Sequence, residues 1–576
     1  MVKIILHDQE LGQWLHFSNP LAVLKADTLA DVVPLLAEVD HFVERRGFFA
    51  AGWIGYEASR AFDSALRTHP ATAFPLLCFG IFERPTILPE MAPAGPAYPH
   101  AGWRPSVSKG QYAAAIAQVK EHIAAGDTYQ VNYTLRLWNE FHEDAWTFFL
   151  SACGDARYGA YIEAPPYYIC SASPELFFSL KGNRIFSRPM KGTAPRGRTT
   201  AEDSENSLFL HNSEKNRAEN VMIVDMIRND LGKIAAFGSV NVPRLYEIEK
   251  YPTVLQMTST VEAVTNAPLS VIMEALFPCA SITGAPKAKT MEIIAALETT
   301  PRNIYTGTIG YFGPGRRALF NVAIRTTLID TATGRAEYGV GGGIVWDSTT
   351  DDEYEECLTK ARVILNPVSP VPFSLLETIL WTPAEGFFLQ SRHLERLKDT
   401  ADYFGYPYDE SRVVENLHAA ISALPPSPHR IRLLLAQNGE IKCQAIALEK
   451  PAAKPVQVKL ANEPVSSRNP FLFHKTTRRE VYEQAKAPFP DTDDVILYNE
   501  RGEITESSIA NIVILKEGRL VTPPVSCGLL NGAYRAQLLA DGKITEEIIP
   551  IAALKNARQI FLVNSVRKWR EAALLP

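Results

Sequence analysis

The sequence has few cysteines, and none of them forms a Cys-x-x-Cys pair. Its seven cysteines are scattered over 576 residues and are odd in number. This pattern argues against both a disulfide framework and a structural zinc site. We therefore expect a protein whose thiols stay reduced, in the cytoplasm.

Long apolar runs and basic clusters are also missing. No stretch of about 18 apolar residues occurs, and the first residues lack the apolar core of a signal peptide. The formal net charge is −6 without any basic run, so we expect neither a membrane nor nucleic acid as a partner. A small anionic substrate would need local positive charge or a metal ion.

The composition is typical of a soluble folded protein, with 46% apolar and 21% charged residues. Long helical patterns and many short strand patterns alternate up to about residue 366, which predicts an α+β domain. Three prolines within residues 366–373 then deny both helix and sheet. The predicted organisation is a domain over 1–366, a linker over 367–373 and an independent domain over 374–576.

The most informative stretch is 187–197, which reads Ser-Arg-Pro-Met-Lys-Gly-Thr-Ala-Pro-Arg-Gly. Its prolines and glycines predict a turn-rich connection, with Lys191 in the middle. A lysine that is desolvated or lies near another cation loses its proton and can attack carbon. The stretch resembles the Pro-Ile-Lys-Gly-Thr motif of aminodeoxychorismate synthase component I, in the chorismate-binding family. Anthranilate synthases of this family usually have alanine at the lysine position.

Four further segments resemble this family, in family order, and they span much of 105–365. They are Ser173-Pro-Glu-Leu-Phe, Arg217–Asp230, Ser281–Ile294, and the region from Tyr305 to Ala361. The resemblance implies a sandwich of antiparallel sheets with helices. Glu175 is a candidate acid/base if burial raises its pKa. Thr283 and Gly284 are expected to lead into a helix whose N-terminus attracts a carboxylate.

The resemblance also implies the remaining site residues of the first domain. Glu219 and Glu356 would bind Mg²⁺, which suits a pair of carboxylates completed by substrate oxygens and water. Tyr305 and Arg325 would hold the enolpyruvyl carboxylate, assisted by backbone around Gly341 and Gly343, and a planar guanidinium suits that role. The expected substrate-binding set is Thr193, Gln256, Thr283, Gly284, Tyr305, Arg325, Gly341 and Gly343.

One position departs from the family. Where many members have histidine, this chain has Gln256, which cannot take up a proton near neutral pH. We therefore expect Gln256 to steer the leaving hydroxyl rather than to act as acid or base. The implied reaction is attack of Lys191 on C2 of chorismate, loss of the C4 hydroxyl, and addition of ammonia at C4. No Cys-His glutaminase arrangement is evident, so ammonia would come from solution or a separate glutamine amidotransferase subunit.

The second domain resembles fold-type IV pyridoxal phosphate enzymes, and among them aminodeoxychorismate lyase. The resemblance implies an α+β fold and pyridoxal phosphate as cofactor, bonded to Lys475, and leaves open a homodimer through this domain. Glu506 would face the pyridine nitrogen and keep it protonated. The residues expected to contact the cofactor are Lys475, Arg396, Glu506, Gly532, Ala533 and Ser565. Together the halves would convert chorismate to 4-aminobenzoate for folate synthesis.

Three alternatives remain at this point. The first domain could be an anthranilate-type synthase, although Lys191 speaks against it. The second domain could be an aminotransferase for branched-chain or D-amino acids, since fold-type IV motifs are shared. A non-catalytic regulatory or scaffold protein with relic sites is the third, and it predicts a colourless protein that takes up no pyridoxal phosphate.

Overall fold

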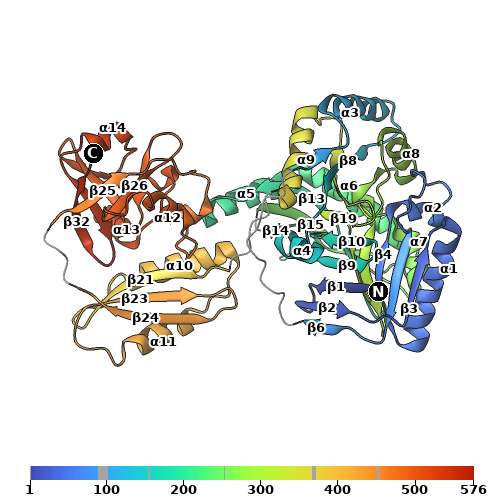
Figure 1. The fold of residues 1–576 in the computed structure, drawn as a ribbon, viewed down its shortest axis with the longest axis horizontal. Helices are drawn as coiled ribbons and strands as arrows, with labels where there is room; N and C mark the ends of the chain where they lie inside the picture. Colours follow the sequence, from blue (N-terminus) through green and yellow to red (C-terminus); the bar gives the residue numbers. More distant parts are fainter. Residues whose placement is uncertain (1, 89–101, 154–155, 252, 366–371, 450–453) are drawn as a thin grey trace. The chain divides into compact units, whose positions relative to one another are not determined.

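The computed structural model describes residues 2–88, 102–153, 156–251, 253–365, 372–449 and 454–576 (Figure 1). The chain divides into two compact units. The first is Met1–Ala194 with Phe209–Val371, and the second is Pro195–Leu208 with Pro372–Pro576. The second unit therefore includes a short segment from the first half of the sequence. Most of the predicted linker, residues 367–371, lies outside the described part.

The first unit contains two antiparallel sheets of ten strands each. One sheet has the order β16 (Gly284–Ala285), β8 (Gln130–Glu140), β20 (Arg335–Ile344), β19 (Thr326–Asp330), β10 (Tyr167–Ser171), β9 (Ala160–Ala164), β1 (Lys3–Asp8), β2 (Gln13–Phe17), β6 (Thr86–Leu88), with β7 (Arg104–Pro105) beside β8. The other has the order β13 (Met190–Pro195), β15 (Val254–Val264), β12 (Arg184–Arg188), β11 (Leu176–Lys181), β18 (Arg317–Val322), β17 (Thr308–Gly313), β4 (Phe49–Ile54), β5 (Leu77–Phe82), β3 (Ala22–Ala26), with β14 (Asn241–Lys250) beside β15. The predicted sandwich of antiparallel sheets is confirmed.

The two sheets pack against each other through apolar side chains on their inner faces, and their outer faces are apolar as well. In β1, Ile4 and Leu6 belong to the core between the sheets, together with Trp53 from the other sheet. Ile5, which lies between them in sequence, points to the opposite side and joins a core formed with helices. Successive side chains of a strand point to opposite faces, so this continuous apolar run predicts a sheet covered on both sides.

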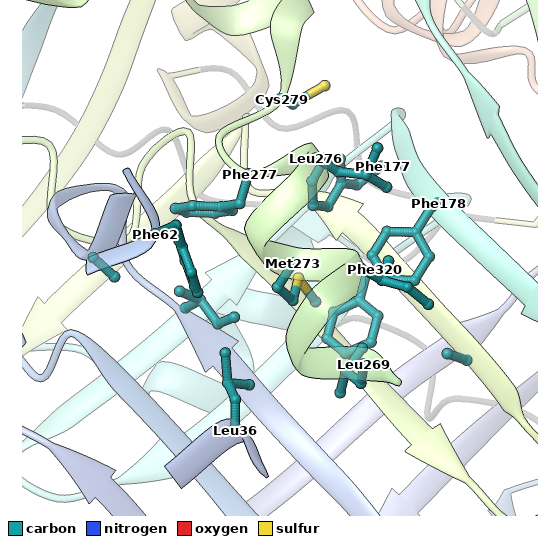
Figure 2. Packing of buried hydrophobic residues seen from close by; sticks show 14 of the residues in the cluster. Leu36, Phe62, Phe177, Phe178, Leu269, Met273, Leu276, Phe277, Cys279 and Phe320 are labelled. Carbon is teal, nitrogen blue, oxygen red and sulfur yellow. The ribbon is translucent and has the colours of Figure 1, made fainter. Parts of the chain in front are cut away.

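Helices cover the two outer faces. The helices of this unit are α1 (Leu29–Asp40), α2 (Ser59–Phe62), α3 (Lys109–Ala124), α4 (Ala145–Cys153), α6 (Glu214–Gly232), α7 (Leu269–Leu276), α8 (Lys287–Leu297) and α9 (Thr350–Leu365), with the short turns η1 (His41–Arg45), η2 (Tyr56–Ala58) and η3 (Ala280–Ile282). Figure 2 shows α7 packed with Leu269 and Met273 among aromatic side chains of the core, including Phe62 and Phe178. Another helix, α5 (Thr200–Asn212), begins in the second unit and ends in the first.

The second unit also combines helices and sheets. A four-stranded sheet has the order β22 (Gly386–Phe387), β21 (Leu375–Thr382), β23 (His429–Leu435), β24 (Ile441–Ala447). An eight-stranded sheet has the order β27 (Ile504–Ser507), β26 (Asp494–Tyr498), β25 (Val456–Leu460), β32 (Lys568–Leu574), β31 (Ile560–Asn564), β28 (Asn511–Lys516), β29 (Arg519–Thr522), β30 (Thr545–Glu546). Because β27 also pairs with β28, part of this sheet closes on itself. The predicted α+β class is confirmed.

The helices of the second unit are α10 (Gln390–Phe404), α11 (Glu410–Ile421), α12 (Glu480–Lys486), α13 (Ala533–Ala540) and α14 (Ile551–Lys555), with the turns η4 (Pro470–Leu472) and η5 (Val525–Cys527). Helices α10 and α11 share one apolar core with the four-stranded sheet. Within the described residues, no helix combines the length and apolar character needed to cross a membrane.

One local expectation was wrong. The turn predicted over 187–197 contains a strand, β13, whose end residue is Pro195. Proline is tolerated there because β13 lies at an end of the sheet order, where the missing N–H need not pair. The helix expected after Thr283 and Gly284 is present as α8, Lys287–Leu297, and Gly284 and Ala285 pair with β8 just before it.

Candidate functional site

The site in the first unit begins with Lys191 on β13. Its backbone carbonyl accepts a hydrogen bond from Asn220 Nδ2 at 3.2 Å, and Gln256 Nε2 donates to the next carbonyl, that of Gly192, at 2.8 Å. Gly192 has φ +96°, a conformation that favours glycine. Sequence reasoning missed Asn220, although an asparagine on a long helix beside a candidate lysine is a signal for such a contact. These bonds fix the strand that carries the amine.

Four charged groups surround the amine of Lys191. Burial lowers the pKa of Lys191, while the carboxylates of Glu219, Glu175 and Glu356 oppose this shift and the charge of Lys360 adds to it. The three glutamates come from α6, from the residue before β11 and from α9. The fold thus brings together the predicted catalytic and metal-binding residues around one half-buried lysine.

Glu175 is a buried carboxylate, only 4% exposed. Ser281 donates a hydrogen bond to its Oε1 at 2.6 Å. Burial raises the pKa of Glu175 to about 7, even though the Ser281 hydrogen bond and the charge of Lys191 act in the opposite direction. A carboxyl group with this pKa can hold a proton near neutral pH and release it, which is what a general acid requires.

The two candidate metal ligands lie on different helices. Glu219 is half-buried on α6, and Glu356 on α9 forms an ion pair with Lys360 at 2.7 Å. Burial would raise the pKa of Glu356, but Lys360 outweighs it and keeps the pKa below its usual range. No group of three or more metal-ligating side chains occurs among the described residues. Two carboxylates completed by substrate oxygens and water still suit Mg²⁺, so the donor set fits that ion.

Glycines on β20 make room beside the amine. A Cβ on Gly343 would lie 2.3 Å from Gln130 Nε2 and 2.9 Å from Lys191 Nζ. One on Gly341 would lie 2.4 Å from a backbone oxygen of β8, so neither position admits a larger residue. Gln130 was missed from the sequence. Both polar atoms of its buried amide lack a hydrogen-bond partner within the described residues, and only its place in an apolar strand could have drawn attention to it.

Arg325 and Tyr305 differ in their surroundings. Arg325 is half-buried with φ +50°, and within the described residues its guanidinium makes no hydrogen bond or ion pair. An arginine held in this strained backbone without an anion is suited to receive one. Tyr305 is buried beneath Arg136, whose guanidinium lies 5.1 Å from the ring centre, and burial raises the pKa of Tyr305 well above its usual range.

The remaining predicted residues of the first unit take different places. Thr193 is exposed and donates to Gln256 Oε1 at 3.1 Å, so both belong to the support of the Lys191 strand. Thr283 is fully buried, and its carbonyl accepts the N–H of Asn132 at 2.8 Å. Gly284 has φ +140°, and a Cβ there would lie 2.0 Å from the carbonyl oxygen of Gln130.

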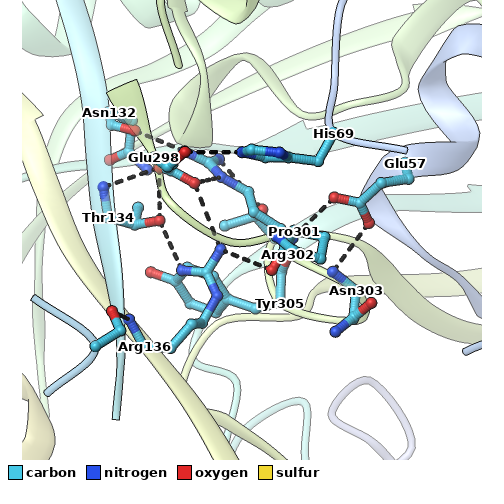
Figure 3. Close-up of polar contacts among 12 residues, drawn as sticks. Glu57, His69, Asn132, Thr134, Arg136, Glu298, Pro301, Arg302, Asn303 and Tyr305 are labelled. Atoms are coloured by element: carbon cyan, nitrogen blue, oxygen red, sulfur yellow. Dashed lines mark hydrogen bonds and ion pairs between the residues drawn. The ribbon is translucent and has the colours of Figure 1, made fainter. Parts of the chain in front are cut away.

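Figure 3 shows a buried ionic network that joins Glu298 to Arg302 and Arg136. Arg302 donates to Glu298 Oε1 at 2.6 Å and to the carbonyl of Ile282 at 3.0 Å. Thr134 Oγ1 also donates to Glu298 Oε1, at 2.7 Å, and Arg136 lies 3.4 Å from Oε2. Arg302, Arg136 and Glu298 are almost completely buried. The network therefore fixes the turn that carries Thr283.

We expect Glu298→Gln to lower the free energy of unfolding of the first unit by about 3–5 kcal/mol. The substitution keeps the shape of the side chain but removes the charge that buried Arg302 and Arg136 share, and within the described residues Arg136 keeps only Glu337, 4.0 Å away. The denaturant midpoint of that unit measures the effect. Glu292→Gln on α8 is the matched control, because its ion pair with Lys289 is exposed. An unchanged midpoint for Glu298→Gln would contradict the role of the network.

The site in the second unit centres on Lys475. Burial lowers the pKa of Lys475 to about 8, and the charge of Arg396 adds to this shift. Arg396 forms an ion pair with buried Glu377 at 2.8 Å and donates to the carbonyl of Asn531 at 3.1 Å. Burial would raise the pKa of Glu377, but Arg396 outweighs it and holds the pKa well below its usual range.

Glu506 is buried on β27 and is held from two sides. Tyr482 donates to its Oε1 at 2.7 Å, and the N–H of Leu530 donates to the same atom at 3.2 Å. Burial raises the pKa of Glu506 to about 7 although both hydrogen bonds lower it. A cationic partner would restore the charged form. Tyr482 was missed from the sequence, although it follows Lys475 on the next helix.

The turn before α13 forms a cradle. A Cβ on Gly532 would lie 2.1 Å from Asn511 Oδ1, so only glycine fits as the N-cap of α13. Ala533 is the first, buried residue of that helix, whose free N–H groups suit a phosphate. Arg396 reaches the carbonyl just before this turn. The N–H groups of α13 and Arg396 therefore fit the phosphate of pyridoxal phosphate, and the Glu506 carboxylate fits its protonated ring nitrogen. Ser565 is buried after β31, and no hydrogen bond in the described part links it to this set.

Comparisons with known proteins agree with this division. Residues 1–366 match the chorismate binding enzyme family, and residues 374–575 match the amino-transferase class IV family. The chain is 41% identical over 254 residues to aminodeoxychorismate synthase component 1 of Bacillus subtilis, covering 43% of this chain and 54% of that protein. The Escherichia coli protein of the same name is 40% identical over 267 residues, covering 46% and 58%. The chain thus spans somewhat more than half the length of these relatives.

Among solved structures, anthranilate synthase component I from Streptococcus pneumoniae is 23% identical with a TM-score of 0.53. The match covers 63% of this chain and 92% of that one. At this identity the likeness concerns the fold alone.

Proposed function

Since the chain belongs to the chorismate binding enzyme family, we propose that residues 1–366 aminate chorismate at C4 to give 4-amino-4-deoxychorismate. The observation that carries this proposal is the half-buried amine of Lys191, whose pKa burial lowers, next to Glu175, Glu219 and Glu356. An anthranilate-type reaction has no use for an amine there. The similarity to aminodeoxychorismate synthase component 1 supports the same choice.

In the proposed reaction Lys191 bonds to C2 of chorismate while Glu175 gives a proton to the departing C4 hydroxyl. Ammonia then adds at C4, and the bond to Lys191 breaks. Arg325 and Tyr305 bind the enolpyruvyl carboxylate, and the glycines of β20 let backbone approach it. Glu219 and Glu356 would hold Mg²⁺, which neutralises the charge of the ring carboxylate. Ammonia would be delivered by a separate glutamine amidotransferase subunit.

We further propose that residues 374–576 eliminate pyruvate from this intermediate to give 4-aminobenzoate, a precursor of folate. Arg396, Gly532 and Ala533 would hold the phosphate of pyridoxal phosphate, and Ser565 would add a contact. When bound, the cofactor withdraws electrons from the carbon that loses its proton. Glu506 would face the ring nitrogen, and Lys475 would remove the C4 proton. The match to the class IV amino-transferases, the half-buried Lys475 and the buried Glu506 support this assignment.

One experiment tests both halves. The full chain with pyridoxal phosphate is incubated with chorismate, an ammonium salt and Mg²⁺, and the products are identified by mass and chromatography. We expect 4-aminobenzoate and pyruvate without any added lyase. Formation of 2-aminobenzoate would refute the first proposal. Accumulation of 4-amino-4-deoxychorismate, together with amino-group transfer from added amino acids, would refute the second.

The pH dependence should report Glu175. Its pKa of about 7 predicts that kcat/KM for amination falls as pH rises above about 7, because the general acid loses its proton. The Ser281 hydrogen bond lowers this pKa, so in Ser281→Ala the fall in kcat/KM should occur about one pH unit higher. Pre-steady-state pH profiles with saturating Mg²⁺ measure the shift. Ser151→Ala, on α4, is the control. If kcat/KM of Ser281→Ala fell at the same pH as in the unchanged protein, the assignment of Glu175 as the general acid would be contradicted.

A further inference from the structure

A segment of the first sequence half belongs to the second unit. Pro195–Leu208, which we call the strap, is grouped with Pro372–Pro576 rather than with the residues on either side of it. It begins at the last residue of β13 and continues into α5. Its contacts within the second unit gather around the residue that precedes Lys475.

The strap has a rigid turn of its own. Arg196 forms an ion pair with Asp203 at 2.7 Å, and Asp203 is fully buried. The N–H of Gly197 donates to the same carboxylate at 2.7 Å, and a Cβ on Gly197 would lie 2.4 Å from the backbone nitrogen of Asp203. A buried ion pair with an added backbone hydrogen bond defines one geometry, so the carbonyl groups of Gly197 and Arg198 are presented in fixed positions.

Those carbonyl groups receive bonds from two aromatic residues. The hydroxyl of Tyr403 donates to the Gly197 carbonyl at 2.8 Å, and Arg196 donates to the Tyr403 carbonyl at the same distance. His474 Nε2 lies 3.1 Å from the Arg198 carbonyl oxygen. The His474 ring stacks on Tyr403 with centroids 4.1 Å apart. The strap, α10 and the Lys475 segment thus form one packed layer.

The direction of the His474 bonds follows from its surroundings. The ring is buried, and burial lowers the pKa of His474 to about 4, so it is neutral near pH 7. A carbonyl oxygen only accepts, so Nε2 carries the hydrogen and donates to Arg198. Nδ1 then accepts from the hydroxyl of Thr400, 3.3 Å away. Both ring nitrogens are satisfied, and the ring cannot turn without losing both bonds.

We propose that the strap is part of the pyridoxal phosphate site, and that His474 is a positioning residue through which it fixes the approach of Lys475. This inference rests on the proposed lyase function. It means that a segment from the first half of the sequence helps to position a catalytic residue of the second half. Removing the strap contact should leave Lys475 chemically intact but free to take other orientations. A displacement of about 1 Å at a reacting group can cost about 10²-fold in rate.

The test uses the full chain, and its first two variants leave residues 1–366 unchanged in sequence. His474→Leu removes the donor to the strap, whereas His474→Gln restores an amide N–H at a similar reach. We expect His474→Leu to lower kcat for pyruvate release from supplied 4-amino-4-deoxychorismate by roughly 10- to 100-fold with little change in KM. His474→Gln should recover most of this loss, and amination of chorismate should stay within about twofold of the unchanged protein.

A second readout needs neither cofactor nor activity. Hydrogen exchange of the backbone amides over 472–478, in the protein without pyridoxal phosphate, should speed up in His474→Leu and in the strap variant Asp203→Asn. The double variant should exchange no faster than the faster single variant, because both changes disrupt the same contact, that between His474 and the strap. Ser204→Ala is the matched control, since this exposed strap residue bonds only to its own helix.

The outcomes separate the two proposals. Unchanged exchange over 472–478 in both single variants, or additive effects in the double variant, would overturn the role of the strap. If the unchanged protein released no pyruvate, the lyase function would fail, but the exchange experiment would still decide the role of the strap. Equal loss of amination and pyruvate release in His474→Leu would also overturn it, because the effect would then not be local to Lys475.

Discussion

We expect the Lys191→Ala variant to lose formation of 4-amino-4-deoxychorismate by at least about 10³-fold. The amine of Lys191 is the group proposed to bond to C2, and Asn220 and Gln256 hold its strand in place. Without it, the remaining nucleophile is ammonia itself. Any residual product should therefore carry nitrogen at C2 rather than at C4. Mass spectrometry with chromatographic separation of the two aminobenzoates measures both the loss and the change of position.

The control for this variant is Lys289→Ala, which removes an exposed lysine of α8. It should aminate chorismate at the normal rate. Lys191→Ala should still convert supplied 4-amino-4-deoxychorismate to 4-aminobenzoate, which shows that the second domain is folded, and an unchanged denaturant midpoint of the first unit shows the same for the first. Normal C4 amination by Lys191→Ala would contradict covalent catalysis by this residue, whatever the second domain does.

Lys475→Ala should stop 4-aminobenzoate formation, by at least about 10³-fold, while chorismate is still consumed. The intermediate 4-amino-4-deoxychorismate should accumulate. Lys475 is the expected attachment point of pyridoxal phosphate, and burial lowers its pKa to about 8, so much more of the free amine exists near neutral pH than for an exposed lysine. Borohydride treatment should fix the cofactor to the 475 peptide of the unchanged protein and to no peptide of the variant.

The matched control is Lys442→Ala, because Lys442 is an exposed lysine of β24 in the same unit. This variant should bind the cofactor and release pyruvate normally. Retention of covalently fixed cofactor in Lys475→Ala would show that another lysine carries it. Transfer of amino groups from added amino acids by the unchanged protein, at rates comparable to pyruvate release, would instead favour an aminotransferase.

Much of the fold followed from local patterns. Ser108 as a candidate N-cap and the helical spacing of the apolar residues after it predict a helix to about Ala125, and the structure has α3, Lys109–Ala124, with its capping box present. The alternation over Thr128–Glu140 predicts a strand, which is β8. These elements are set by nearest-neighbour chemistry, namely caps, side-chain period and proline positions, which are all visible in one dimension. The strand within 187–197 was missed because its pairing with a distant strand leaves no mark in the local turn signals.

The candidate site was likewise predictable only in part: its reactive residues follow from motifs, whereas their surroundings depend on the fold. Motif order alone named Lys191, Glu175, Lys475 and Glu506, because each carries a chemical group that its motif requires. The direction of their pKa shifts depends on burial and on neighbours far away in sequence, such as Ser281 and Tyr482. No single-sequence pattern contains those distances. Gln130 and Asn220 escaped notice for this reason, since each matters only through what the fold brings beside it.

The sequence by itself predicted the kind of chemistry, which is two lysines in two separate motif sets, and two domains joined by a proline-rich linker. Only the tertiary structure decided that the residues after Lys191 leave their own domain. Within the second unit, the backbone carbonyls of the strap accept hydrogen bonds from the side chains of Tyr403 and His474. Backbone carbonyls are the same at every residue, so the sequence carries no mark of which of them will be used.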